Sequence, residues 1–180
     1  MTSIVANADL IIRAAANADA EHIAAIFAHY VTSTMVTFEL EPPTIQDWQD
    51  KVRESQSAGR PFVVGVASGQ VVGYAYVSPW RLKPAYRHTV EDSVYLAPGH
   101  TGLGYGRSLL ADLLARASGT GARQVIAVIA DTGHPASVRL HQGAGFTQAG
   151  RLRQVGFKHG HWIDTLLLQR DLSTVMAGPQ

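Results

Sequence analysis

Hydrophobic and polar positions along the chain follow two different periods. Apolar and β-branched runs predict strands at residues 10–13, 62–67, 71–77, 88–96, 124–130 and 163–169. Ser68, Gly69 and Gln70 separate the second run from the third and predict a hairpin turn. The run 124–130 is almost unbroken, so we expect that strand to be covered on both faces.

Apolar residues at helical spacing predict four helices. Asn17 is expected to cap the first, with acidic residues in the turn that follows it. Thr44 and Asp47 have the spacing of a capping box and predict the start of the second. Gly145 and Phe146 are expected to end the fourth. The third and fourth helices are expected at residues 107–117 and 135–144.

The order of these elements predicts a single domain of the α/β (α+β) class. A hairpin comes early and a strand–helix–strand unit lies in the middle, so a mixed sheet is expected. The length of 180 residues is suited to one core. We expect that core at about residues 10–172 and a loose C-terminal tail at residues 173–180.

Composition excludes several classes of protein. The net charge is +1, which gives no strong attraction to nucleic acid or to an anionic membrane. The chain has 0 cysteines, which excludes disulfides, thiolate nucleophiles and cysteine-based zinc sites. No signal-peptide pattern opens the sequence, and no apolar stretch is long enough to span a bilayer. We therefore expect a cytoplasmic protein.

A glycine-rich turn lies between a predicted strand and an amphipathic helix. Its residues are Thr101, Gly102, Leu103, Gly104, Tyr105 and Gly106. Glycines allow a ligand to approach the backbone closely, and a helix N-terminus offers unpaired N–H groups and partial positive charge. The turn therefore suits a phosphate or pyrophosphate, although a tight turn without a ligand fits the glycines equally well.

Two nucleotide-binding alternatives fit this turn poorly. A P-loop ends in Gly-Lys-Ser/Thr, whereas Arg107 and Ser108 follow Gly106 here. A dinucleotide-binding fold places such a turn after the first strand of a repeated parallel unit, whereas this turn lies in mid-chain.

The order of elements around this turn resembles the core of the GNAT acetyltransferases. Further segments resemble the phosphinothricin N-acetyltransferase branch, which includes enzymes for methionine sulfoximine and methionine sulfone. These segments are residues 36–39, 80–81, 85–86, 89–91, 93–95 and 155–164. The resemblance covers residues 10–172. It implies an αβα sandwich with a mixed, mostly antiparallel sheet that is splayed where acetyl-CoA binds.

The resemblance also implies the acetyl-CoA contacts and a homodimer. Expected cofactor-binding residues are Val94, Tyr95, Leu96, residues 101–106, Arg107, His134 and Ser137. The family motif usually opens with Arg or Gln where Thr101 stands, so backbone N–H groups should carry most of the pyrophosphate contact. Many relatives have Asn in place of His134, a position that implies a contact to the pantetheine arm.

Acetyl transfer needs a neutral amine, so a base must remove a proton from the protonated form. Glu91 is the candidate base, and the resemblance implies the same role; spacing alone favours a surface glutamate paired with an arginine. The resemblance implies that a backbone N–H of Val94, Tyr95 or Leu96 stabilises the oxyanion. His141 stands where many GNATs have a tyrosine, so it is a candidate acid for the departing thiolate; helix packing explains it equally well.

Six side chains are candidates for binding the amine substrate. Arg81 suits a carboxylate or phosphinate, and Lys158 adds positive charge. Trp80 and Tyr86 are expected as pocket walls, and the resemblance implies that Phe38 and Glu39 belong to a loop that covers the substrate. Each also has an ordinary interpretation as a core, loop or surface residue.

A metal site is not expected. His159 and His161 are close in sequence, but no HExxH motif or carboxylate cluster joins them to His134 or His141. The leading hypothesis is N-acetylation of a small amino-acid-like amine by acetyl-CoA. The alternatives are acetylation of a polyamine, an aminoglycoside or a protein N-terminus, and a non-catalytic acyl-CoA-binding module.

Overall fold

The computed structural model describes residues 9–173, so the predicted loose tail lies outside the described residues apart from Ser173. One sheet of 7 strands has the order β1-β2-β3-β4-β5-β7-β6. The strands are β1 (Leu10–Ala14), β2 (Phe62–Ala67), β3 (Gln70–Pro79), β4 (Thr89–Leu96), β5 (Gln124–Asp131), β6 (Thr147–Lys158) and β7 (His161–Asp171). The α-helices are α1 (Ala20–Ser33), α2 (Ile45–Ser57), α3 (Tyr105–Ser118) and α4 (Ala136–Gly143). Within residues 9–173, no helix is both long and apolar enough to cross a membrane.

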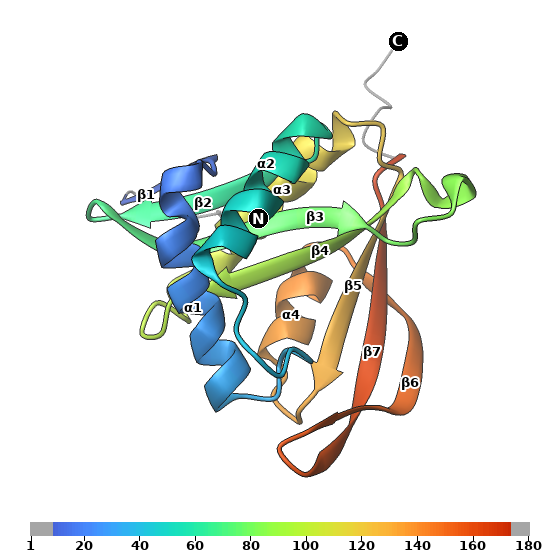
Figure 1. Ribbon diagram of the computed structural model, residues 1–180. Helices are drawn as coiled ribbons and strands as arrows, with labels where there is room; N and C mark the ends of the chain where they lie inside the picture. The colour runs from blue at the N-terminus through green and yellow to red at the C-terminus, as the bar shows by residue number, and fades with distance from the viewer. Residues whose placement is uncertain (1–8, 174–180) are drawn as a thin grey trace.

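Helices cover both faces of the sheet, with α1 and α2 on one face and α3 on the other (Figure 1). Strand β3 shows how alternation separates the two cores. Tyr74 and Tyr76 pack in the cluster under α1 and α2. Ala75 and Val77 pack in the cluster under α3, together with the leucines of that helix. The sandwich expected from the sequence is confirmed.

The sheet opens between β4 and β5, its one parallel pair. Pairing runs only from Thr89 opposite Gln124 to Asp92 opposite Ala127. Beyond these residues β4 continues along β3, whereas β5 continues along β7. The two strands diverge in Figure 1, and α4 lies within the angle between them. The predicted splay is therefore present.

Two local predictions are confirmed by hydrogen bonds and backbone angles. Thr44 and Asp47 form the capping box of α2, with Asp47 N–H donating to Thr44 Oγ1 over 3.2 Å and Thr44 N–H donating to the Asp47 carboxylate over 2.8 Å. Ser68 and Gly69 have φ of 50° and 78°, as a tight hairpin turn requires.

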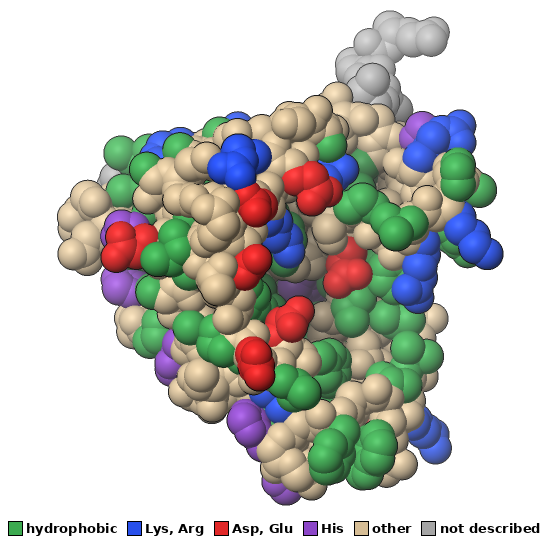
Figure 2. Space-filling model, in the orientation of Figure 1, with side chains coloured by type: hydrophobic (Ala, Val, Ile, Leu, Met, Phe, Trp, Pro, Cys, Tyr) green, Lys and Arg blue, Asp and Glu red, His purple; other side chains and the backbone are tan. Residues whose placement is uncertain are grey.

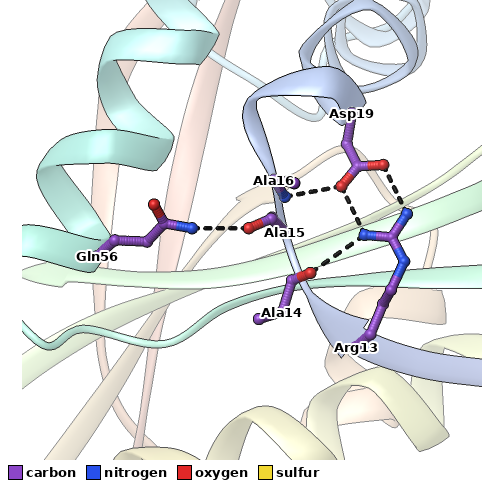
Figure 3. Close-up of polar contacts among 6 residues, drawn as sticks. All are labelled: Arg13, Ala14, Ala15, Ala16, Asp19 and Gln56. Atoms are coloured by element: carbon purple, nitrogen blue, oxygen red, sulfur yellow. Dashed lines mark hydrogen bonds and ion pairs between the residues drawn. The ribbon is translucent and has the colours of Figure 1, made fainter.

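The predicted cap at Asn17 is wrong. Asn17–Asp19 is a 3-10 turn, and α1 begins only at Ala20. Asp19 is the group that organises this start: its carboxylate accepts two hydrogen bonds of 2.7 Å from Arg13 and one of 2.8 Å from Ala16 N–H (Figure 3). Gln56 of α2 donates to the Ala15 carbonyl in the same region, so the turn joins β1 to both helices.

Replacing Asp19 by asparagine is expected to lower the free energy of unfolding by about 1–2 kcal/mol, because the buried carboxylate and its charge-assisted hydrogen bonds are lost. The partial exposure of Arg13 limits the loss. The Arg13 hydrogen bonds hold the pKa of Asp19 below its ordinary value. The stabilisation is therefore present above the unfolded pKa of about 3.9 and is lost as pH falls through the folded pKa. Urea denaturation at several pH values measures this. Asp50→Asn, in an exposed pair, is the control; equal losses for both variants would contradict the prediction.

Candidate active site

A cavity of about 500 Å³ opens between the loop after α1, the ends of β3 and β4, and the β6–β7 hairpin. Its lining is Phe38, Leu40, Trp80, Arg81, Glu91, Val128, Leu152, Val155, Gly156, Phe157, Thr165 and Leu167. Four predicted residues, Phe38, Trp80, Arg81 and Glu91, are thus brought together. Figure 2 shows a hollow in the face that carries α1 and α2, with acidic side chains around its rim.

Glu91 lies on β4 with its side chain in this cavity. Burial raises the pKa of Glu91, and the charge of the neighbouring Asp92 acts in the same direction, against the smaller opposing effects of Arg81 and Lys51. A carboxylate with a raised pKa is a stronger base than an ordinary carboxylate. The site therefore contains a group suited to accept a proton.

Arg81 follows β3 and supplies positive charge beside Glu91. Its Cζ lies 4.6 Å from the centroid of the Trp80 ring, a cation–π distance that orients the guanidinium. Lys51 of α2 is a further cation near Glu91, with its Nζ 4.3 Å from the Tyr76 ring centroid. The sequence analysis missed Lys51, because nothing in a polar helix sequence shows which lysine faces a cavity.

Lys158 does not occupy the predicted position in the substrate pocket. Its residue is 2% exposed, and its ammonium donates to the Thr37 carbonyl over 2.9 Å. Phe38, the next residue, packs directly against Gly156 of β6. Glu39 is exposed and outside the cavity lining, and its charge acts on Lys158. Lys158 therefore ties β6 to the loop that contains Thr37 and Phe38.

Tyr86 also differs from the prediction that it forms a pocket wall. It ends the short 3-10 turn Pro84–Tyr86 and is 45% exposed, outside the cavity lining. The apolar walls come instead from β5, β6 and β7. Residues of β6 were missed because that strand was not predicted: glycines and two register shifts interrupt its alternation.

The glycine turn leaves its backbone accessible. Gly102 and Gly104 have φ of 77° and 82°, and a side chain added at either would meet nothing within 4 Å. The N-cap residue of α3 is Gly104, which has no side chain that could accept hydrogen bonds from the first N–H groups of the helix. Those N–H groups therefore remain available to a ligand. Exposed residues at this end are Thr101, Leu103 and Arg107, whereas Tyr105 and Gly106 are buried. The turn and helix therefore fit a pyrophosphate group.

Backbone alternation selects among the three predicted oxyanion donors. Ala97 N–H donates to Val72 on β3. Alternation then directs the Tyr95 N–H toward β3 as well, and the N–H groups of Val94 and Leu96 toward the gap beside β5. Val94 and Leu96 thus keep the expected orientation, and Tyr95 does not.

The far wall of the gap carries the remaining predicted residues. His134 is exposed, and its Nδ1 lies 3.4 Å from the Ala136 N–H at the start of α4. Ser137 is half-buried on the first turn of that helix. His141 is buried and faces Asp92 of β4, a partner that the sequence analysis did not identify. Within residues 9–173, no group of three His, Cys, Asp or Glu residues is arranged to hold a metal ion.

Comparisons with known proteins agree with this arrangement. The acetyltransferase (GNAT) domain family matches residues 12–167. A phosphinothricin N-acetyltransferase of Alcaligenes faecalis is 44% identical over 162 residues, which cover 90% of this chain and 82% of that one. An L-methionine sulfoximine/L-methionine sulfone acetyltransferase of Salmonella typhimurium is 36% identical, covering 89% and 94% of the two chains.

A solved structure shares the fold over nearly its full length. A GNAT superfamily phosphinothricin acetyltransferase from Sinorhizobium meliloti, in complex with acetyl-CoA, superposes with a TM-score of 0.88 at 39% identity and covers 95% of this chain and 92% of that one. The splayed parallel pair and the glycine turn are the features expected of a GNAT acetyltransferase. The chain belongs to the GNAT acetyltransferase family.

Proposed function

We propose that this protein transfers an acetyl group from acetyl-CoA to the α-amine of a small amino-acid-like substrate of the L-phosphinothricin or methionine sulfoximine type. The observation that carries the proposal is a half-buried carboxylate, Glu91, in one apolar cavity with the guanidinium of Arg81. The names of the relatives described above support the same substrate class.

The donor is expected to bind in the gap between β4 and β5. The glycine turn and the N-terminus of α3 hold its pyrophosphate, and residues at the start of α4 line the pantetheine arm. The N–H groups that face the gap, those of Val94 and Leu96, receive the negative charge that develops on the thioester oxygen.

The acceptor is expected to bind in the cavity with its acidic group on Arg81 and its amine near Glu91. Glu91 takes a proton from the amine, directly or through a water, so that nitrogen can bond to the acetyl carbon as the carbon–sulfur bond breaks. The apolar walls and the covering loop held by Lys158 exclude water, which strengthens the electrostatic contacts inside.

Thiol release from acetyl-CoA by the purified protein tests the proposal. The acceptors are L-phosphinothricin, L-methionine sulfoximine, L-methionine sulfone, spermidine and kanamycin. Saturable release with the first three supports the proposal. Release only with the cationic amines, which the acidic rim in Figure 2 favours, would overturn the substrate class but keep the acyl donor.

Replacing Arg81 by methionine is expected to raise the KM for L-phosphinothricin by roughly 10- to 100-fold, because a charge-assisted contact worth about 1.5–3 kcal/mol is lost. The KM for acetyl-CoA should stay unchanged. Steady-state kinetics with each substrate varied in turn measure both. Arg87→Met is the matched control, since Arg87 lies on the same loop outside the cavity lining. Equal effects of the two substitutions would contradict the assignment.

We also propose a homodimer that joins two chains through the β6–β7 hairpin. Phe157 and Trp162 are 55% and 63% exposed, with ring centroids 5.0 Å apart, on the strands that end the sheet. Exposed apolar pairs of this size favour an interface. Light scattering should give twice the chain mass of 19.3 kDa. A monomeric mass would refute the dimer.

The cytoplasmic location expected from the sequence stays a prediction.

A further inference from the structure

A buried ion pair joins the two walls of the gap. His141 Nε2 of α4 lies 2.9 Å from Asp92 Oδ2 of β4, with side chains 6% and 0% exposed. The other ring nitrogen, Nδ1, lies 2.8 Å from the Ser137 carbonyl oxygen. The Phe146 ring packs edge-on against the imidazole, with centroids 5.0 Å apart. Both ring nitrogens therefore have a partner, and the imidazole is held in one orientation.

The two partners decide the protonation of the imidazole. A carbonyl oxygen only accepts, so Nδ1 must carry a hydrogen. Nε2 can carry a second hydrogen, because a carboxylate at Asp92 accepts it. Burial lowers the pKa of His141, but the hydrogen bond and charge of Asp92, with the Ser137 carbonyl, outweigh it and raise that pKa overall. The two contacts and the raised pKa both favour the imidazolium form of His141.

Other charged groups near α4 point elsewhere. Glu91 is next to Asp92 in sequence, but alternation places its side chain on the opposite face of β4. Arg170 of β7 donates to the Ala144 carbonyl at the end of α4. Arg139 and His134 are exposed. Among the described residues, Asp92 is the charged group that acts on His141.

The position of this pair in the sheet gives it a role. Asp92 is the last residue of β4 that pairs with β5, opposite Ala127, so the ion pair lies where the two strands part. It connects the β4 wall of the gap to α4, which follows β5 in the chain and forms part of the other wall. Apolar contacts also hold α4, such as Leu140 of α4 near Gly106 of α3.

We propose that the Asp92–His141 ion pair is a latch that sets the width of the gap for the acyl donor, which makes Asp92 a positioning residue for acetyl-CoA binding. This inference rests on the proposed acyl donor. It also revises the role predicted for His141: with both N–H groups committed, the imidazolium cannot give a proton to a thiolate without leaving Asp92 or Ser137.

The latch should open as pH rises. The folded pKa of His141 lies above its unfolded value of about 6.5, so the pair is fully formed below that value and is lost as pH rises through the folded pKa. A neutral imidazole has one N–H for two acceptors, so one contact must break. Acetyl-CoA affinity is expected to fall in that alkaline range by roughly 10-fold, within the usual size of such couplings.

Calorimetric titration of acetyl-CoA into wild type, Asp92→Asn and Asp112→Asn at pH 6 to 9 tests the latch. Asp112 pairs with Arg116 on α3 and is the matched control. Asp92→Asn keeps the shape but removes the charge, so it should bind roughly 10-fold more weakly at pH 7 and lose the alkaline dependence. Asp112→Asn should follow wild type. The His141 ring signals in NMR spectra should titrate at lower pH in Asp92→Asn.

Three outcomes separate the possible failures. Wild-type affinity that stays constant while the His141 signals titrate would overturn the latch, and this result needs no variant to fold. Unchanged acetyl-CoA affinity in Asp92→Asn with a reduced kcat would also overturn it, in favour of proton donation by His141. Absence of acetyl-CoA binding by the wild type would overturn the acyl donor on which the latch and the proposed function both rest.

Discussion

Replacing Glu91 by glutamine is expected to lower kcat by about 10²- to 10⁴-fold, the usual contribution of a positioned general base. Glutamine has nearly the same shape and still fits the cavity, but it cannot accept the amine proton. Because burial and Asp92 raise the pKa of Glu91, wild-type activity should fall as pH drops through that raised value, and the variant should lack this acid limb. Rates of thiol release between pH 5 and 9, at saturating substrates, measure both effects.

The control for this prediction is Glu54→Gln, an exposed glutamate of α2 that pairs with Arg60. It should retain wild-type kinetics. Acetyl-CoA affinity should be unchanged in Glu91→Gln, since the carboxylate acts on the acceptor. An acid limb that persists in Glu91→Gln, or a kcat within a few-fold of wild type, would assign the proton transfer to another group.

The second large effect is expected from Gly156→Ala. A Cβ at this position would lie 2.0 Å from Phe38 Cε1 and 2.5 Å from Cδ1, so the ring must move out of its place in the cavity wall. Overpacking of this kind costs about 1–3 kcal/mol, which corresponds to a rise of roughly 5- to 150-fold in the KM for the acceptor. The KM for acetyl-CoA should change little, because the covering loop lies on the acceptor side.

Two further variants isolate the cause of this effect. Gly150→Ala, on the same strand, has its nearest neighbour at 3.9 Å and should behave like wild type. In a Phe38→Ala background the added methyl group meets no ring, so Gly156→Ala should have almost no additional effect. Additive effects of the two substitutions would show that Gly156 matters for another reason, such as the backbone geometry of β6.

Local chemistry explains which parts of the fold were predictable. The Thr44–Asp47 box, the Ser68–Gly69 turn and the glycine turn before α3 each depend on residues within a few positions of one another, so the pattern determines them. Asn17 looked like a cap by the same logic, but Arg13 and Asp19 organise that turn through a salt bridge. Strand β6 was missed because its bulges and glycines disrupt the period of two.

For the site, the resemblance to a known family pointed to Glu91 and Arg81, whereas spacing alone favoured a surface role for Glu91. The site was not predictable where a contact joins distant segments. Lys158 and Thr37 are 121 positions apart, and the sequence gives no sign that this lysine is buried. Asp92 and His141 are 49 positions apart. Alternation along β4 places the side chain of Asp92 on the face opposite that of Glu91. Alternation does not show which residue Asp92 meets there.

A competition assay tests the central claim most directly. Purified protein is given acetyl-CoA with equal concentrations of L-phosphinothricin and spermidine, and mass spectrometry measures the ratio of the two acetylated products, which reports the ratio of their kcat/KM values. A large excess of N-acetylphosphinothricin, lost on substitution of Glu91 by glutamine, is the result that we predict. An excess of acetylspermidine would contradict the claim that this cavity recognises an amino-acid-like acceptor.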